Sequence, residues 1–422
     1  MRVFLPYGNT GLYVEFPATV HVVEPNWVPG LLDEAAAIKQ ALDCPIGSAP
    51  LRHLVRPGDR AVIVHPDMTR PMPSRRVLPV LLRELEAAGL QPDHITLLNA
   101  LGTHRRQTDQ ELEEMLGEPV VRGYRCLQHD CWDDANLVSL GLTHLGHPVR
   151  VNRTYLEADI RILTGFVEPH LFAGFSGGPK GVLPSIAGFD SVLTNHGAEM
   201  VRNPGATWGV TEGNPIWQEM MEVALMTRPT FILNITLNRQ RAITGVFAGD
   251  LQAAHAAGRA FCRQSAMVPV PHLYDVVVTT NSGYPLDLNL YQSVKGMSAA
   301  AKIVKPGGSI VLVAECREGI PEHGEYARLL VGSDGPAAYL ARMEEPGFAC
   351  MDQWEAQVQA LVQLRADVHL YADGMTDHQI RQSWLVPCRD LECRVVELLT
   401  DRGRNATLCV MPDGPQTIPY LS

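Results

Sequence analysis

The sequence predicts an α/β protein of two domains, each built on a mostly parallel sheet, with an active-site cleft between them. Buried-strand runs alternate with segments of helical spacing along the chain, which is the pattern of βαβ units. The length of 422 residues also exceeds that of a typical single domain. We expect an N-terminal domain over residues 1–266 and a C-terminal domain over residues 273–422.

The N-terminal domain contains runs of apolar and β-branched residues of the kind that form buried strands. These runs predict strands over residues 61–65, 94–100, 159–164 and 231–237. A helix is predicted over residues 74–88, where apolar residues recur at helical spacing until Gly89. Thr108 and Glu111 form a capping-box pattern, which predicts the start of a further helix.

The C-terminal domain is predicted to follow a proline-containing linker at residues 267–272. Its first strand is expected over residues 274–281, and a helix over residues 290–304 that ends at a Lys-Pro-Gly-Gly segment. Later strands are predicted at residues 309–315, 369–371 and 408–411. The order of elements is again that of a parallel sheet.

Composition argues for a cytoplasmic protein that binds a small molecule. A net charge of −11 is unlike that of a general nucleic-acid or membrane-surface binder. The nine cysteines are scattered and odd in number, as expected for reduced thiols. Cys126 and Cys131 near His129 have metal-binding side chains, but their spacing is wider than in usual zinc pairs. The sequence shows neither a signal-peptide pattern nor an apolar run that would span a membrane.

Polar side chains follow the predicted strands at the points where the strands end. Ligands of open α/β sheets bind at the carboxyl ends of strands, so these side chains are expected to share one interdomain cleft. The candidates are Asp67, Thr69 and Arg70 after the first strand, His104 after the second, His170 and Lys180 after the third, and Tyr291, Gln292 and Lys295 on the first C-terminal helix. Tyr291 and Lys295 are four residues apart and share one helix face.

A glycine-rich loop over residues 168–181, followed by Asn195-His196-Gly197, is the most informative segment. Glycines allow close approach of a ligand, histidines bind metals or carry protons, and a lysine pairs with phosphate or attacks an electrophilic carbon. The loop is not a Walker A motif, because proline precedes Lys180 and glycine follows it. The glycine fingerprint of the usual nicotinamide-binding folds is also missing.

Several of these residues also have a purely structural explanation. Asp67 could cap the next helix and pair with Arg70, and His104 could be an ordinary loop histidine. Tyr291 and Lys295 could lie on a solvated helix face. The combination of two histidines and a lysine in one glycine-rich region is harder to explain without a function.

Taken together, these segments resemble the lactate racemase family of nickel-pincer-nucleotide enzymes over nearly the whole chain. Asp67-Met-Thr-Arg70 is similar to the Asp-x-x-Arg motif of the family, and Gly102-Thr-His104 to its first catalytic-histidine motif. The loop over 168–181 is similar to the segment with the second histidine and the cofactor lysine. Asn195-His196 resembles the nickel-ligand motif, and Tyr291 to Lys295 the substrate-side helix.

The resemblance implies a cofactor, a pyridinium-3,5-bisthiocarboxylic acid mononucleotide that holds nickel through one carbon and two sulfurs. It implies that His196 is the metal ligand and that Lys180 carries the cofactor or lies beside it. Thr69, Gly177 and Gly178 would also contact the cofactor, the glycines through backbone N–H groups that meet its phosphate. Enzymes that assemble the cofactor would be partners of the protein.

The resemblance also assigns roles around the substrate. His104 and His170 would be catalytic residues on opposite sides of the substrate carbon, and Asp67 would orient a catalytic histidine. The substrate carboxylate and hydroxyl would be held by Arg70, Tyr291, Gln292 and Lys295. Trp354 is similar to a further family position near the site.

The chemistry agrees with racemisation of a 2-hydroxy acid. The C2 hydrogen of such an acid is a poor proton, because the neighbouring carboxylate is already charged. Reversible hydride transfer to the cofactor through a keto acid avoids a carbanion, and the protein then supplies binding and proton transfer. We expect an isomerase acting on lactate, with malate, a longer 2-hydroxy acid or a sugar acid as alternatives. A phosphate-binding α/β hydrolase or transferase using Lys180 and Arg70, or a cofactor carrier, remain the alternatives from other classes.

Overall fold

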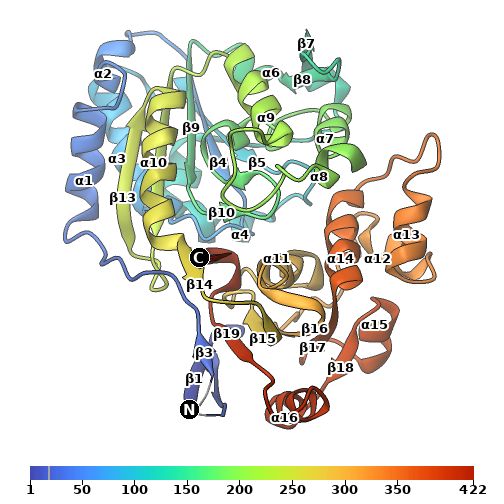
Figure 1. Cartoon of the computed structure of the whole chain (residues 1–422). Coiled ribbons are helices and arrows are strands. Elements are labelled where there is room, and N and C mark those ends of the chain that lie inside the picture. The colour runs from blue at the N-terminus through green and yellow to red at the C-terminus, as the bar shows by residue number, and fades with distance from the viewer. Residues whose placement is uncertain (18–19) are drawn as a thin grey trace.

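The computed structural model of the chain describes residues 1–17 and 20–422 and contains two α/β units, one above the other in Figure 1. The upper unit has a six-stranded sheet in the order β13-β12-β9-β4-β5-β6. Its strands are β4 (Ala61–Pro66), β5 (Ile95–Ala100), β6 (Arg125–Gln128), β9 (Ile160–Phe166), β12 (Phe231–Leu237) and β13 (Ile243–Gly249). All pairs are parallel except that between β12 and β13.

The lower unit has a second six-stranded sheet, in the order β18-β17-β16-β15-β19-β3. Its strands are β15 (Tyr274–Thr280), β16 (Val304–Val313), β17 (Ala366–Tyr371), β18 (Val386–Cys388), β19 (Leu408–Met411) and β3 (His21–Val22). Every pair in this sheet is parallel. The predicted fold class, two α/β domains with mostly parallel sheets, is therefore confirmed.

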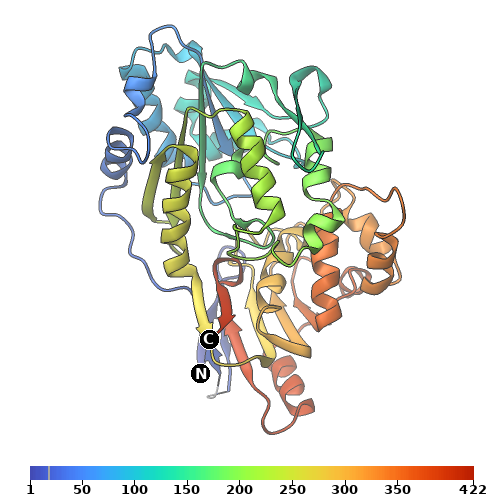
Figure 2. The ribbon, with the colours of Figure 1, turned by 45° about the horizontal axis from the view of Figure 1, so that its top comes forward.

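Helices surround both sheets (Figure 2). In the upper unit they are α1 (Glu34–Asp43), α2 (Leu51–Leu54), α3 (Ser74–Ala87), α4 (Asp109–Leu116), α5 (Glu118–Gly123), α6 (Arg153–Leu156), α7 (Phe189–Asn195), α8 (Ala198–Arg202), α9 (Pro215–Met226) and α10 (Leu251–Ala266). In the lower unit they are α11 (Leu290–Ala300), α12 (Tyr326–Val331), α13 (Pro336–Arg342), α14 (Gln353–Arg365), α15 (Asp377–Gln382) and α16 (Leu391–Asp401). None of the helices in the described residues is long and apolar enough to span a membrane.

Short elements complete the chain. The short strands are β1 (Arg2–Leu5), β2 (Leu12–Glu15), β7 (Leu137–Leu142), β8 (Pro148–Asn152), β10 (Pro169–His170), β11 (Gly174–Phe175), β14 (Met267–Val270) and β20 (Ile418–Leu421). The 3-10 turns are η1 (Pro92–His94), η2 (Asp134–Asn136), η3 (Gly178–Gly181) and η4 (Gly414–Gln416). The predicted capping box is present, because Thr108 Oγ1 accepts from Glu111 N and the Glu111 carboxylate accepts from Thr108 N.

The upper sheet is buried on both faces, which explains the uninterrupted apolar runs of its strands. Ile63 packs into the core formed with α1 and α3, whereas Val62 and Val64 on the same strand face the opposite core. That second core continues into the lower unit through residues of α11 and α14. The carboxyl ends of β4, β5 and β9 meet the lower unit, so polar residues after these strands lie at the junction of the two units (Figure 1).

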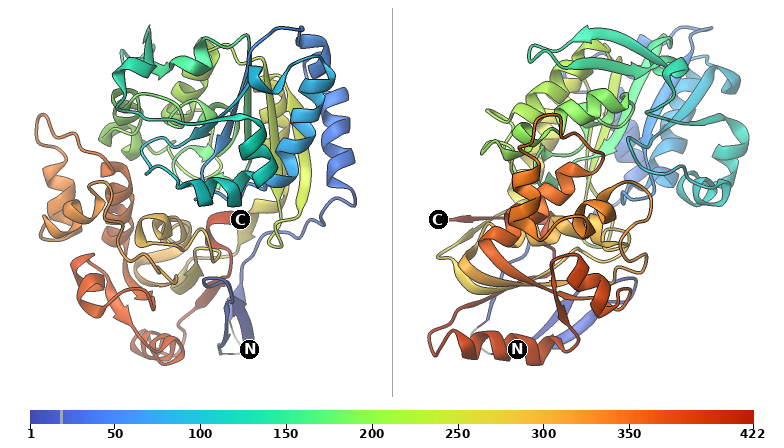
Figure 3. Two further views of the ribbon diagram at one scale, coloured as in Figure 1. Left: turned by 180° about the vertical axis from the view of Figure 1, so that it is seen from behind. Right: turned by 90° about the vertical axis from the view of Figure 1, so that its right-hand side faces the viewer.

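The first residues of the chain do not pack where the predicted N-terminal domain, residues 1–266, would place them. The first strands belong with the C-terminal unit, since β3 pairs with β19 and β2 lies beside α16 (Figure 3). Val3 and Leu5 alternate with exposed residues on β1, and this apolar face packs against Val276 and Val278. The expected linker is also ordered, because residues 267–270 form β14 and pair with β20. One further difference is that β16 begins at Val304, within the segment predicted to end a helix.

Candidate active site

A cavity of about 120 Å³ lies where the strand ends of the upper unit meet α11 and α14. It gathers almost all of the site residues predicted from the sequence. Those that line it are Asp67, Arg70, His104, His170, Gly177, Lys180, His196, Tyr291, Gln292 and Lys295. Thr69 and Gly178 do not line it, and Trp354 and Glu355 of α14 do.

His104 is held by a carboxylate from the neighbouring strand end. Asp67 Oδ2 is hydrogen-bonded to His104 Nδ1, and Asp67 Oδ1 accepts from Thr69 Oγ1 at 2.7 Å. Burial alone would raise the pKa of Asp67, but the charges of His104 and Arg70 and these hydrogen bonds hold it below its usual range. Asp67 therefore stays ionised, and its carboxylate fixes the orientation of the His104 ring.

Thr69 acts inside this network instead of facing the cavity. Its hydroxyl donates to Asp67 and accepts from Arg70 Nη1 at 2.7 Å. Arg70 is thereby oriented from the loop after β4 while its guanidinium still lines the cavity. The contacts of Thr69 within the protein are those of a residue that positions Asp67 and Arg70, and the cofactor contact predicted for it stays a prediction.

His170 lies on the tight β10–β11 hairpin, where it is directly opposite Gly174. Its Nδ1 accepts a hydrogen bond from Ala173 N at 3.3 Å, and its ring meets Phe172 edge-on at 4.7 Å. Burial, followed by the charges of Lys180 and other cations, lowers the pKa of His170 well below its usual value. The ring is thus a neutral imidazole, and because Nδ1 accepts, its proton lies on Nε2, which has no protein partner in the described residues and is available as a donor.

His196 follows the last turn of α7 and is only 3% exposed. Its ring is held edge-on by Phe172 at 5.1 Å and by Trp354 at 5.2 Å. Its Nδ1 is buried and has no hydrogen-bond partner among the described residues. Burial lowers its pKa well below the usual value, so the imidazole is neutral, which is the form that binds metals.

Lys180 lies in η3 and also lines the cavity. Burial, and then the charges of Arg70 and Lys295, lower its pKa to about 7. A large fraction of this amine is therefore neutral and nucleophilic near neutral pH. Gly177 precedes the turn with a φ of 75°, a conformation that favours glycine.

Gly178 faces the interior of the upper unit, unlike Gly177. Its N–H donates to Asn234 Oδ1 at 2.8 Å, and a Cβ built on it would lie 2.5 Å from His255. Its backbone donor is therefore already used within the protein. This contact differs from the predicted one to a cofactor phosphate and leaves Gly177 as the predicted glycine at the cavity.

The three predicted residues of α11 are enclosed, so they do not lie on a solvated helix face. Lys295 is 8% exposed and donates to Gln292 Oε1 at 2.9 Å. Tyr291 OH accepts from Trp354 Nε1 at 2.8 Å, which ties α11 to the first turn of α14. Burial and the charge of Arg70 lower the pKa of Lys295 to about 8.

Comparison with known proteins places this chain in a family. The lactate racemase N-terminal domain matches residues 7–209, and the lactate racemase C-terminal domain matches residues 271–418. The chain belongs to the lactate racemase family. As in the enzymes that give the family its name, its reaction class is that of an isomerase.

Two curated relatives in the family show how far the similarity extends. The lactate racemase of Thermoanaerobacterium thermosaccharolyticum is 36% identical over 99% of this chain and 99% of its own length. That of Lactiplantibacillus plantarum is 36% identical over 91% of this chain and 90% of its own length.

Solved structures show that the similarity extends to the fold. The lactate racemase apoprotein of T. thermosaccharolyticum superposes with a TM-score of 0.92 at 33% identity, over 99% of this chain and 100% of that one. A Thermotoga maritima protein, at 19% identity, has a TM-score of 0.73 over 94% of this chain and 100% of its own and shares the fold.

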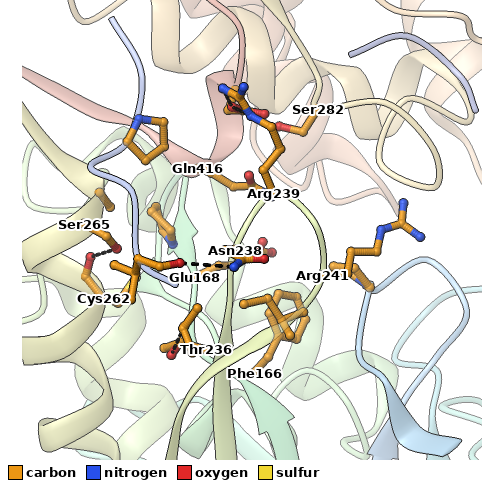
Figure 4. Close-up of a pocket in the computed structure, with 18 of the residues that line it drawn as sticks. Phe166, Glu168, Thr236, Asn238, Arg239, Arg241, Cys262, Ser265, Ser282 and Gln416 are labelled. Atoms are coloured by element: carbon orange, nitrogen blue, oxygen red, sulfur yellow. Dashed lines mark hydrogen bonds and ion pairs between the residues drawn. The ribbon is translucent and has the colours of Figure 1, made fainter. Parts of the chain in front are cut away.

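A second, larger cavity of about 220 Å³ lies behind the Glu168–Pro169 segment, between the units (Figure 4). Phe166 lines both cavities. In the second one Arg239 bridges the units, since its Nε is 2.7 Å from Asp413 Oδ2 and its Nη2 is 2.7 Å from Glu24 Oε2. No histidine or lysine among the described residues lines this cavity, so its size does not make it the candidate for the family's chemistry.

The site also contains one residue that the sequence did not reveal. Glu355, next to Trp354, lines the same cavity as Lys295 and is 4% exposed. A glutamate in the first turn of a helix is common, because it interacts favourably with the helix dipole. Its burial depends on the packing of α14 against α11, for which the sequence gives no local signal.

Proposed function

We propose that this isomerase racemises lactate at C2 and uses nickel held by a pyridinium pincer nucleotide. The observation that best supports this proposal is that two histidines and several cationic side chains line the same cavity. His104 and His170 come from different loops, each is oriented through its Nδ1, and each lines the cavity that also holds Arg70 and Lys295. Racemisation needs a proton-transfer group for each enantiomer, and a carboxylate substrate needs the cations.

The residues of the cavity divide into three tasks. Arg70 and Lys295 bind the substrate carboxylate, with Tyr291 and Gln292 as hydrogen-bonding neighbours. His104 and His170 accept the hydroxyl proton from one enantiomer and return a proton to form the other. The small, mostly buried cavity keeps water away from the oxidised form of the substrate.

The residues present fit the proposed nickel cofactor. Neutral His196, with a buried ring nitrogen lacking a partner, suits Ni(II). No group of three or more His, Cys, Asp or Glu side chains in residues 1–17 and 20–422 is arranged to hold a metal ion. Nickel at His196 would therefore take its other ligands from a cofactor, which Lys180 would hold through its amine. When bound, the cofactor supplies a reversible hydride acceptor for C2.

The decisive experiment follows single enantiomers of lactate, malate, 2-hydroxybutyrate and an aldonic acid by chiral chromatography. The protein is produced together with the cofactor-assembly enzymes, and its nickel content is measured. We expect conversion of lactate in both directions, loss of conversion in His104→Ala and His170→Ala, and full activity in His144→Ala. His144 is the matched control, since its side chain is 60% exposed and lies outside the cavity.

The other outcomes are equally informative. Conversion of malate or an aldonic acid in place of lactate would change the substrate and keep the reaction. A nickel-loaded protein that converts none of these acids would contradict the proposed substrate class. A protein that binds no nickel under these conditions would contradict the cofactor proposal.

A cytoplasmic location is part of the same proposal. All nine cysteines lie in the described part of the chain and are unpaired. Free thiols in this number are typical of a reducing compartment. Fractionation of the native host, with the protein found in the membrane or secreted fraction, would contradict it.

A further inference from the structure

Glu355 is an acidic residue inside a cavity built for anions. It lies in the first turn of α14, is 4% exposed and lines the candidate active site. Asp67 is the other acidic residue that lines this cavity in the described chain, and it is engaged by His104 and Thr69. Glu355 thus differs from Asp67 in having no assigned partner.

The carboxyl group of Glu355 is incompletely satisfied. Its Oε1 is buried and makes no hydrogen bond to any residue that the structure describes. A buried polar atom without a partner is unfavourable, so such an atom at a cavity wall indicates a role with ligand bound.

The helix packing places Glu355 close to the substrate-binding helix. Trp354 Nε1 donates to Tyr291 OH, which fixes the first turn of α14 against the face of α11 that carries Lys295. Among charged groups, Lys295 has the largest influence on Glu355. Glu355 and Lys295 are therefore the acidic and basic neighbours at the carboxylate-binding end of the cavity.

Charged and titratable groups face Glu355 from every element around it. They are Lys295 and Tyr291 of α11, Arg70 after β4, Lys180 of η3, Asp352 before α14 and Tyr326 of α12. Burial raises the pKa of Glu355 to about 8, even though the cations act to lower it. The group therefore changes charge near neutral pH, and an anion placed on its cationic neighbours favours the protonated form.

We propose that Glu355 is a positioning residue for the substrate carboxylate and acts through Lys295. In the empty site Glu355 is the acidic neighbour of Lys295. When a carboxylate binds to Lys295 and Arg70, Glu355 takes up one proton from solvent, so the ligand's negative charge replaces its own. The inference rests on the proposed function only in that the ligand of Arg70 and Lys295 is a carboxylate.

Infrared difference spectroscopy tests this directly on cofactor-free protein, which does not turn over. Spectra are recorded with and without L-lactate at a pH above the raised pKa of Glu355, so that its carboxyl group is ionised before lactate binds. We expect lactate to add the C=O stretch of a protonated carboxyl group, because Glu355 takes up a proton when the ligand binds. The band should be missing in Glu355→Gln, which keeps the side chain's shape and cannot ionise.

Glu344→Gln is the matched control. It removes the same charge from a side chain that is 64% exposed and pairs with Arg202 outside the cavity. It should retain the band. Wild-type protein carrying carboxyl-13C glutamate should show the isotope shift of a glutamate band, which gives a result even if the glutamine variant does not fold.

Three results would overturn the proposal: a band that persists in Glu355→Gln, lactate binding without any band, or no lactate binding by the cofactor-free wild type. The proposed function is judged separately, by turnover of the nickel-loaded enzyme. A loaded enzyme that does not racemise lactate would refute that function, whereas the spectra on cofactor-free protein would still decide the role of Glu355.

Discussion

Replacing Asp67 with asparagine should impair His104 without removing its hydrogen-bonding neighbour. The amide has the size of the carboxylate but lacks its charge. In the native protein this buried carboxylate stays ionised, because the neighbouring charges and hydrogen bonds hold its pKa below the usual range. The variant therefore tests whether the charge of Asp67, beyond its shape, supports proton transfer at His104.

The geometry sets the expected size of the effect. Two unit charges about 4 Å apart interact by about 4 kcal/mol at an effective dielectric constant of about 20. The side chains of Asp67 and His104 are 3% and 20% exposed, so solvent weakens this interaction only in part. Taking about half, or about 2 kcal/mol, predicts a loss of about 30-fold in rate.

The assay is the pH profile of kcat/KM for lactate racemisation by nickel-loaded enzyme. We expect kcat/KM to fall by about 30-fold across the profile, because the negative charge beside His104 is lost. Glu118→Gln, which breaks an exposed ion pair with Arg122, should leave the profile unchanged. A loss well below about 30-fold would refute the electrostatic reasoning, and a wild-type rate would remove Asp67 from the mechanism.

Three further predictions concern other residues that line the cavity. His196→Ala should reduce nickel content by at least about tenfold while circular dichroism stays unchanged, and full nickel occupancy would contradict its assignment as the ligand. Lys180, with a pKa lowered to about 7, should be acylated in cofactor-free protein at neutral pH much faster than Lys39, whose pKa is raised, and equal labelling by mass spectrometry would argue against a nucleophilic amine. Trp354→Phe removes the hydrogen bond to Tyr291 and should raise KM for lactate by about fivefold, which is equivalent to about 1 kcal/mol. The value of kcat should change little. An unchanged KM would show that this hydrogen bond does not position α11.

The main strands and most of the site could be predicted because both depend on local sequence. A buried parallel strand must be apolar throughout, so β12 was predicted with the bounds that the structure has, residues 231–237. Parallel strands end at one edge, so residues that follow β4, β5 and β9 had to meet. His104 and His170 are neighbours in the cavity for this reason, although they come from separate loops.

What could not be predicted depends on contacts between distant segments. The apolar face of β1 is visible in the sequence, but its partners at Val276 and Val278 are not. Gly177 and Gly178 are adjacent glycines with positive φ, and only the packing of His255 shows that the second one faces the interior. Glu355 carries no local sign of burial, because a glutamate early in a helix is equally common on a surface.

The two histidines proposed as catalytic differ in their access to water, and this bears on how the enzyme would return to its starting state. The His104 side chain is 20% exposed, whereas His170 is 6% exposed on its hairpin. In the proposed reaction a proton taken up at one histidine leaves from the other, so each one-way conversion ends with the two rings in exchanged protonation states. Recovery then requires a proton to cross between solvent and the enclosed ring before the next molecule of the same enantiomer can react. At saturating substrate this internal reset, and not the isomerisation, becomes a candidate for the slowest step.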